Sequence, residues 1–263
     1  MIEKEPKMLP FYRPVGREEE VFEHLFQNKL PLLLKGPTGS GKSRFVEYMA
    51  SKMDKNLITV SCHEETSAVD LLGRFIVKGD ETVWTDGPLT RAVRSGSIVY
   101  LDEIAEARPD VIVAIHSLTD HRRELYLDRI NETVKAPDDF MLIASYNPGY
   151  QGGLRELKAS TRQRFAAMSF DYPQAAVEME ILQQETGINS GNAGLLVKLA
   201  GKIRATVIAG LSETVSTRLL VDAGKLIASG LPPRLSCKIA IIEPMTDDKE
   251  TANALEEFVS MIF

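Results

Sequence analysis

The segment that decides the fold reads Leu32-Leu33-Leu34-Lys35-Gly36-Pro37-Thr38-Gly39-Ser40-Gly41-Lys42-Ser43. An apolar run, typical of a buried strand, leads into a glycine-rich loop and a Lys-Ser pair, which is the pattern of a phosphate-binding loop. The glycines let the backbone wrap around an anion, so that N–H groups and the positive end of the following helix face the phosphates. Lys42 would neutralise the β- and γ-phosphates, and Ser43 would offer its hydroxyl to Mg²⁺. The pattern predicts that ATP and Mg²⁺ bind to Gly36, Pro37, Thr38, Gly39, Ser40, Gly41, Lys42 and Ser43.

Composition excludes several classes of protein. The chain has 263 residues, enough to bury about three quarters of its unfolded surface. A net charge of −6 argues against non-specific nucleic-acid binding, which needs clustered Lys and Arg. No apolar run reaches the roughly 18 residues of a membrane span, and the start of the chain, residues 1–5, lacks a signal-peptide pattern. With only Cys62 and Cys237, the chain suits a reducing compartment. We expect a cytoplasmic protein that acts on protein partners, not on nucleic acid or membranes.

Apolar segments that alternate with helical patterns predict a parallel α/β sheet. The expected strands are residues 30–35, 57–61, 97–101, 140–146 and 166–170. Two hairpins interrupt this alternation. Residues 74–78 and 82–85 flank a Gly79-Asp80 turn, and residues 124–127 and 132–135 form a second pair of short strands. Such projections often carry partner contacts.

From about residue 174 the pattern becomes purely helical. The expected helices are 175–186, 191–206, 217–229, 234–242 and 249–262, separated by breaks that contain Gly or Pro. The chain is therefore expected to comprise an α/β nucleotide-binding domain over residues 1–173 and a small helical lid over 174–263.

A second motif follows the phosphate-binding loop by about sixty residues. The apolar strand around Ile98-Val99-Tyr100-Leu101 ends in Asp102 and Glu103. We expect this strand to lie next to the first one, with its end facing the phosphates. Asp102 would then hold Mg²⁺, and Glu103 would orient and deprotonate the attacking water. An ordinary acidic helix cap is the alternative explanation for this pair.

Three further elements supply polar groups. Asn147 ends the fourth predicted strand, where its amide would sense the γ-phosphate or orient the water. Arg162 and Arg164 precede the fifth strand, and one of them would stabilise transition-state charge in a neighbouring subunit. Arg218 opens a lid helix and would reach the γ-phosphate within its own subunit. Solvated side chains are the alternative for Arg162 and Arg164, and an ordinary arginine at the start of a helix is the alternative for Arg218.

With these motifs assembled, the chain resembles an AAA+ ATPase of the MoxR branch along nearly its whole length. Two features narrow the resemblance to the group of CbbQ, NorQ, NirQ and the gas-vesicle protein GvpN, with CbbQ the best match. These are the stretch of residues 160–165, Ser-Thr-Arg-Gln-Arg-Phe, and the stretch Asn147-Pro148-Gly149-Tyr150. The Gly-Ala-Phe-Thr-Gly-Ala loop of related transcriptional activators is absent from the hairpin, which argues against a sigma-factor client.

The resemblance implies roles for individual residues. Gly36 to Ser43 match Walker A, Asp102 and Glu103 match Walker B, Asn147 matches sensor 1 and Arg218 matches sensor 2. The arginine finger falls on Arg164 or Arg162, and we favour Arg164 because it directly precedes Phe165. The resemblance further implies a homo-hexameric ring that works with CbbO, an adaptor containing a von Willebrand factor A domain. The client would be Rubisco blocked by inhibitory sugar phosphates.

Other functions share much of this sequence pattern. A NorQ-type activator of nitric oxide reductase would contain nearly every residue named above, because motor chemistry does not encode the client. A small-molecule kinase shares the phosphate-binding loop but would transfer phosphate to an acceptor instead of water. A nucleotide-gated scaffold is the non-enzymatic alternative, and a measured rate of ATP turnover separates it from the motor.

Overall fold

The computed structural model describes residues 9–148, 157–206 and 214–263. The N-terminal residues 1–5, which lack a signal-peptide pattern, and Gly149-Tyr150 of the stretch that begins at Asn147 lie outside the described residues. The chain forms two compact units. One contains Gly16–Gly36 and Lys42–Ser169, and the other contains Phe11–Val15, Pro37–Gly41 and Phe170–Phe263.

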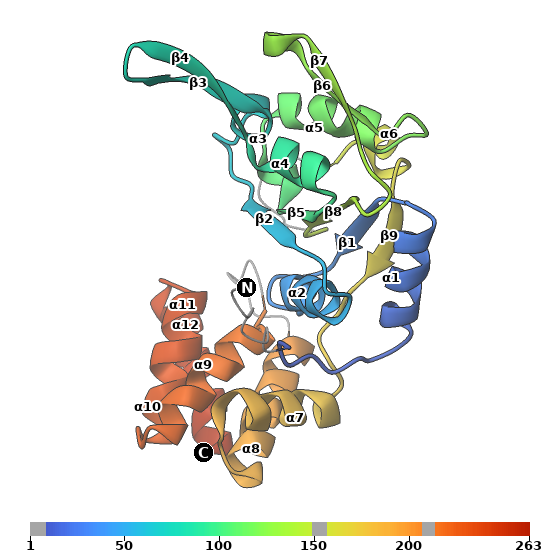
Figure 1. Cartoon of the computed structure of the whole chain (residues 1–263). Helices are drawn as coiled ribbons and strands as arrows, with labels where there is room; N and C mark the ends of the chain where they lie inside the picture. The colour runs from blue at the N-terminus through green and yellow to red at the C-terminus, as the bar shows by residue number, and fades with distance from the viewer. Residues whose placement is uncertain (1–8, 149–156, 207–213) are drawn as a thin grey trace. The chain divides into compact units, whose positions relative to one another are not determined.

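The first unit is built on a five-stranded parallel sheet, as predicted (Figure 1). Its strands run in the order β2-β5-β8-β1-β9. Their bounds are Leu57–Ser61, Ile98–Asp102, Met141–Tyr146, Leu32–Lys35 and Ala166–Ser169, in that order. One expectation was wrong, because β5 does not lie next to β1. Strand β8 lies between them, pairing Leu34 with Ser145 on one side and Leu101 with Ala144 on the other.

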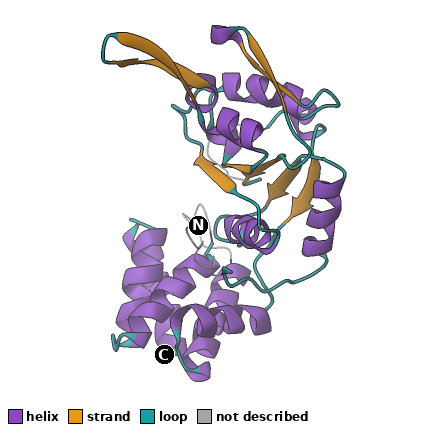
Figure 2. Cartoon of the chain, in the orientation of Figure 1, coloured by secondary structure: helices purple, strands orange, loops and turns teal. Residues whose placement is uncertain are grey.

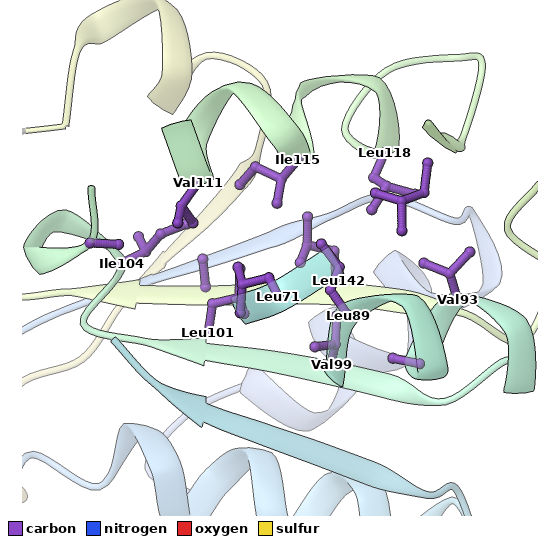
Figure 3. Close-up of a cluster of buried hydrophobic side chains, with 14 of the residues drawn as sticks. Leu71, Leu89, Val93, Val99, Leu101, Ile104, Val111, Ile115, Leu118 and Leu142 are labelled. Atoms are coloured by element: carbon purple, nitrogen blue, oxygen red, sulfur yellow. The ribbon is translucent and has the colours of Figure 1, made fainter. Parts of the chain in front are cut away.

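Helices cover both faces of this sheet. Val99 and Leu101, which alternate along β5, and Leu142 of β8 belong to one large buried cluster (Figure 3). The cluster also includes apolar side chains of α4 (Pro88–Ser95) and α5 (Pro109–Ile115). On α1 (Glu18–Gln27) and α2 (Lys42–Lys52), Phe22 and Phe45 are fully buried and meet edge to face at 5.7 Å between ring centroids. Apolar contacts therefore join the two helices α1 and α2 as well as the sheet and helices α4 and α5.

Both predicted hairpins are present and project from this unit (Figure 1). The first, β3 (Gly73–Lys78) with β4 (Glu81–Asp86), follows the short helix α3 (Ala68–Leu72). The second pairs β6 (Glu124–Leu127) with β7 (Glu132–Lys135), and η3 (Asp128–Ile130) connects them. Arg94 of α4 joins the two hairpins, since its guanidinium contacts Asp86 at 2.9 Å and Glu132 at 2.6 and 2.7 Å.

Helices make up the described part of the second unit from α7 onward (Figure 2). They are α7 (Ala175–Thr186), α8 (Ser190–Ala205), α9 (Thr217–Ala228), α10 (Pro233–Cys237), η4 (Lys238–Ile242), α11 (Glu243–Met245) and α12 (Lys249–Ile262). The regular helix expected over 234–242 begins at Pro233 and continues as a π-helical segment from Lys238. An apolar cluster of its own, including Leu182, Leu196 and Leu220, holds this unit together. None of the described helices is long and apolar enough to cross a membrane.

Candidate functional site

The phosphate-binding loop connects β1 to α2 and has the backbone conformation that its glycines predict. Gly39 and Gly41 have φ values of 68° and 94°, which side chains with a Cβ rarely adopt. Lys42 begins α2, and its side chain is largely buried, with an exposed fraction of 7%. Its Nζ donates to the carbonyl of Gly36 and to Oδ1 of Asn147, both at 2.8 Å. The cation of Lys42 and the predicted sensor amide of Asn147 therefore lie side by side.

Ser43 and Asp102 meet where α2 begins and β5 ends. The Ser43 hydroxyl donates to Oδ2 of Asp102 at 3.1 Å. A hydroxyl beside a carboxylate is the hard oxygen donor set that Mg²⁺ prefers, so these two residues fit the predicted metal. They would hold it together with phosphate oxygens, and the ion would neutralise charge on the β- and γ-phosphates.

Glu103 follows Asp102 in an unusual backbone conformation. Its φ and ψ are 55° and 46°, the left-handed region, which costs a residue with a Cβ about 1–2 kcal/mol. The side chain is exposed, and its Oε1 lies 3.4 Å from Nδ2 of Asn147. The structure thus brings the predicted base and the predicted sensor 1 together. The short helix η1 (Ile104–Glu106) begins directly after Glu103. Glu103 therefore occupies the N-cap position, as the helix-cap alternative expects, but its side chain makes no cap hydrogen bond.

Two buried residues at this site were missed from the sequence. Tyr100 and Ser145, with exposed fractions of 1% and 0%, both reach Asp102. The Tyr100 hydroxyl lies 2.7 Å and the Ser145 hydroxyl 2.5 Å from Oδ1 of Asp102. Burial and the Asp102 carboxylate raise the pKa of Tyr100 above its usual value of 10, which keeps it a hydrogen-bond donor. The sequence does contain a pattern that points to them: in each of two apolar strands, a polar residue lies two positions before a predicted site residue.

Cys62 lies near these carboxylates, but burial raises the pKa of its thiol to about 12. A thiol in that state is neither a good nucleophile nor a good metal ligand.

Arg162 and Arg164 lie around the C-terminal end of α6 (Ala159–Arg162). Both are exposed. Arg164 has 37% of its side chain accessible and lies 3.9 Å from a carboxylate oxygen of Asp120. A finger that acts in a neighbouring subunit must reach the surface, and both guanidinium groups meet that requirement.

In the second unit, Arg218 lies in the first turn of α9, after the N-cap residue Ser216. The loop segment Pro37–Gly41 groups with this unit. There the Tyr172 hydroxyl donates to the carbonyl of Thr38 at 3.2 Å, and Ser40 Oγ donates to the carbonyl of Pro37 at 2.9 Å. A Cβ placed on Gly39 would come within 2.6 Å of Ser216 Cβ, so only glycine fits at this position.

Comparison with known proteins assigns the family. Residues 31–165 match the AAA domain (dynein-related subfamily), and residues 178–262 match the CbbQ/NirQ/NorQ C-terminal domain. NorQ of Paracoccus denitrificans is 54% identical over 97% of this chain and 94% of its own length. The chain belongs to the CbbQ/NirQ/NorQ family. CbbQ of Hydrogenophilus thermoluteolus is 52% identical over 97% of the chain and 95% of that protein, so this family member is about equally similar to both.

Other relatives agree with the assignment. The denitrification regulatory protein NirQ of Pseudomonas aeruginosa is 53% identical over 96% of the chain and 97% of its own length. A putative ATPase from Cytophaga hutchinsonii and a RuvB variant from Thermotoga maritima share the fold, each with a TM-score of 0.54 at 15% identity. The match with the Cytophaga protein covers 94% of this chain and 80% of that protein. The match with the RuvB variant covers 92% of this chain and 68% of that protein. This family member is an AAA+ ATPase by fold and sequence, as the resemblance predicted.

Proposed function

We propose that this chain is the ATP-hydrolysing subunit of a hexameric motor that remodels a protein client. The convergence of the Walker residues carries the proposal. Ser43 lies 3.1 Å from Asp102, and Lys42 lies 2.8 Å from Asn147, whose amide faces Glu103. In this arrangement Lys42 binds phosphate, Glu103 deprotonates water, and Asn147 senses the γ-phosphate or orients the water.

Substitution of the base tests the chemistry. Glu103→Gln keeps the shape of the side chain but removes the proton acceptor, so it should bind ATP and hydrolyse it at least about a hundredfold slower. Glu257→Gln, which neutralises an exposed carboxylate on α12, is the matched control and should hydrolyse ATP normally. ATP binding and phosphate release are measured on the same preparations. Normal turnover by Glu103→Gln would remove Glu103 from the mechanism, and a phosphorylated acceptor in place of free phosphate would favour the kinase.

A ring can be tested by mixing inactive subunits. We propose that Arg164 acts in trans, with Arg162 as the alternative. Arg164→Ala and Glu103→Gln subunits should each be inactive alone, but their mixture should regain ATPase activity at interfaces that combine an intact Glu103 with an intact Arg164. Arg162→Ala should be milder than Arg164→Ala, and the reverse ranking would reassign the finger. Sedimentation of the ATP-bound Glu103→Gln protein should show six subunits, whereas a monomer that hydrolyses ATP fully would contradict the ring.

We propose inhibited Rubisco as the client, with a CbbO-like adaptor that contains a von Willebrand factor A domain. The support is the 52% identity with CbbQ together with the motif resemblance. The 54% and 53% identities with NorQ and NirQ favour nitric oxide reductase as a second candidate. ATP-dependent recovery of carboxylation by sugar-phosphate-inhibited Rubisco, with adaptor present, tests the first candidate. The Glu103→Gln protein is the control, and activation of the reductase alone would select the second candidate.

A further inference from the structure

Buried polar groups lie beneath the Walker B carboxylates, inside the first unit. Tyr100 and Ser145 belong to the strands β5 and β8, whose other side chains are apolar except at their ends. Side chains two residues apart in a strand share a face. Tyr100 therefore faces the same way as Asp102, and Ser145 the same way as Asn147. The pairing of β5 with β8 places these faces side by side.

The hydrogen bonds divide the two oxygens of Asp102. Oδ1 lies 2.7 Å from the Tyr100 hydroxyl and 2.5 Å from the Ser145 hydroxyl, both of which are buried. Oδ2 lies 3.1 Å from the hydroxyl of Ser43. Because two buried hydroxyls engage Oδ1, the carboxylate cannot rotate without losing them. Oδ2 is thereby turned toward Ser43, the other residue that fits Mg²⁺.

Ser145 also holds the backbone of the predicted base. The N–H of Glu103 donates to Ser145 Oγ at 3.1 Å, while the same hydroxyl donates its proton to Asp102. Glu103 has the left-handed conformation described above, which needs support from its surroundings. A single hydroxyl thus fixes both Asp102 and Glu103.

We propose that Tyr100 and Ser145 are positioning residues for ATP hydrolysis. Tyr100 orients Oδ2 of Asp102 toward Ser43, where Mg²⁺ would bind, and Ser145 fixes the position of Glu103 relative to Asp102. This inference rests on the proposed ATPase function. Neither residue is the proposed base or a proposed metal ligand. Tyr100 acts through Asp102 and through Ser43, whose hydroxyl lies 3.2 Å from that of Tyr100, and Ser145 acts through Asp102 and the backbone of Glu103. Loss of such supporting partners typically costs about 10- to 100-fold in metal affinity or activity.

The test uses Tyr100→Phe and Ser145→Ala, which remove the hydroxyls and little else. Thr90→Val is the matched control. Thr90 of α4 is equally buried, and its hydroxyl donates to the carbonyl of Leu72 of α3 at 2.6 Å. Binding of a fluorescent ATP analogue is titrated with Mg²⁺ and repeated with EDTA, which gives a readout independent of turnover. Steady-state hydrolysis then separates kcat from KM, and Ser145→Thr, which retains a hydroxyl, tests rescue.

We expect both variants to need about tenfold more Mg²⁺ for tight binding, while their affinity for ATP in EDTA stays like that of Thr90→Val. Ser145→Ala should also lower kcat more than Tyr100→Phe, since it alone releases Glu103, and Ser145→Thr should recover most of that loss. Equal Mg²⁺ dependence in Tyr100→Phe, Ser145→Ala and Thr90→Val would overturn the inference. That result is distinguishable from failure of the proposed function, in which the unmodified protein itself would not hydrolyse ATP. If Ser145→Ala loses its native circular dichroism, Tyr100→Phe still decides the Mg²⁺ prediction.

Discussion

A buried ion pair in the helical unit permits a quantitative prediction. Glu178 of α7 has an exposed fraction of 1%, and both its oxygens accept hydrogen bonds from Arg204 of α8 at 2.8 Å. The Thr217 hydroxyl donates to the same carboxylate at 2.6 Å. Arg204 also donates to the carbonyl of Val215 at 3.0 Å. The pair therefore ties α7 and α8 to the start of α9, the turn that contains Arg218.

Arg204→Met should destabilise this unit strongly, because it leaves a buried carboxylate without its cation. Breaking one side of a buried pair costs about 3–5 kcal/mol. With a urea slope of roughly 2 kcal/mol per M, the midpoint should fall by about 2 M. In the double variant Glu178→Met/Arg204→Met no charge remains buried. The double variant leaves the Thr217 hydroxyl and the Val215 carbonyl without their hydrogen-bond partners, which should lower the free energy of unfolding by about 1–3 kcal/mol. It should therefore be more stable than Arg204→Met alone.

Unit-specific probes are needed because a chain of two units need not unfold in one step. Trp84 is the only tryptophan and lies on β4, so its fluorescence reports the first unit, while hydrogen exchange resolves α7, α8 and α9. Exchange in these helices should accelerate by roughly 10²- to 10⁴-fold. The control is Lys238→Met, which breaks an exposed pair with Glu256 and should cost less than about 1 kcal/mol. Equal effects of Arg204→Met and Lys238→Met, or a double variant no better than the single one, would refute the reasoning.

Three more predictions concern the first unit. Arg94→Met should speed hydrogen exchange in both hairpins, because it releases Asp86 and Glu132. It should lower the free energy of unfolding by less than about 1 kcal/mol, because these ion pairs are partly exposed. Unchanged exchange would show that the hairpins are held independently of each other. Burial, reinforced by Arg164, lowers the pKa of His116 below 6.5, so the unfolded chain takes up this proton first and stability falls as pH drops below 6.5. In His116→Gln the melting temperature should fall less steeply between pH 6.5 and 5, and identical slopes would contradict this. Leu101→Ala should cost about 2–5 kcal/mol by urea unfolding, because the side chain is fully buried; a loss below 1 kcal/mol would show that the core collapses around the cavity.

Local patterns accounted for most of the first unit. The bounds expected for the second strand match β2, and both hairpins lie where short β-prone runs flank a turn. These features depend on neighbouring residues: periodicity determines which side chains can be buried, and glycine determines where the chain can reverse. The π-helical segment Lys238–Ile242 was not predicted, because its composition does not distinguish it from an α-helix.

Contacts between distant segments were less predictable. Glu178 and Arg204 lie 26 residues apart on the consecutive helices α7 and α8, and each looks like an ordinary charged helix residue until the fold buries both. Tyr100 and Ser145 did have a signal, since each lies two positions before a predicted site residue in an apolar strand. That spacing places them on the functional face, but only the strand order shows that they meet.

The strand order explains why the site forms at all. Parallel strands are joined by long crossovers, so a motif on one strand does not reveal which strand lies beside it. The expectation that β5 borders β1 would have brought Asp102 close to the phosphate-binding loop but left no strand between them. Because β8 occupies that position, Ser145 can contact Asp102 and Glu103 on one side, while Asn147 contacts Lys42 on the other. Strand β8 therefore supplies the groups that align the carboxylates at the end of β5, Asp102 and Glu103, with Lys42 of α2.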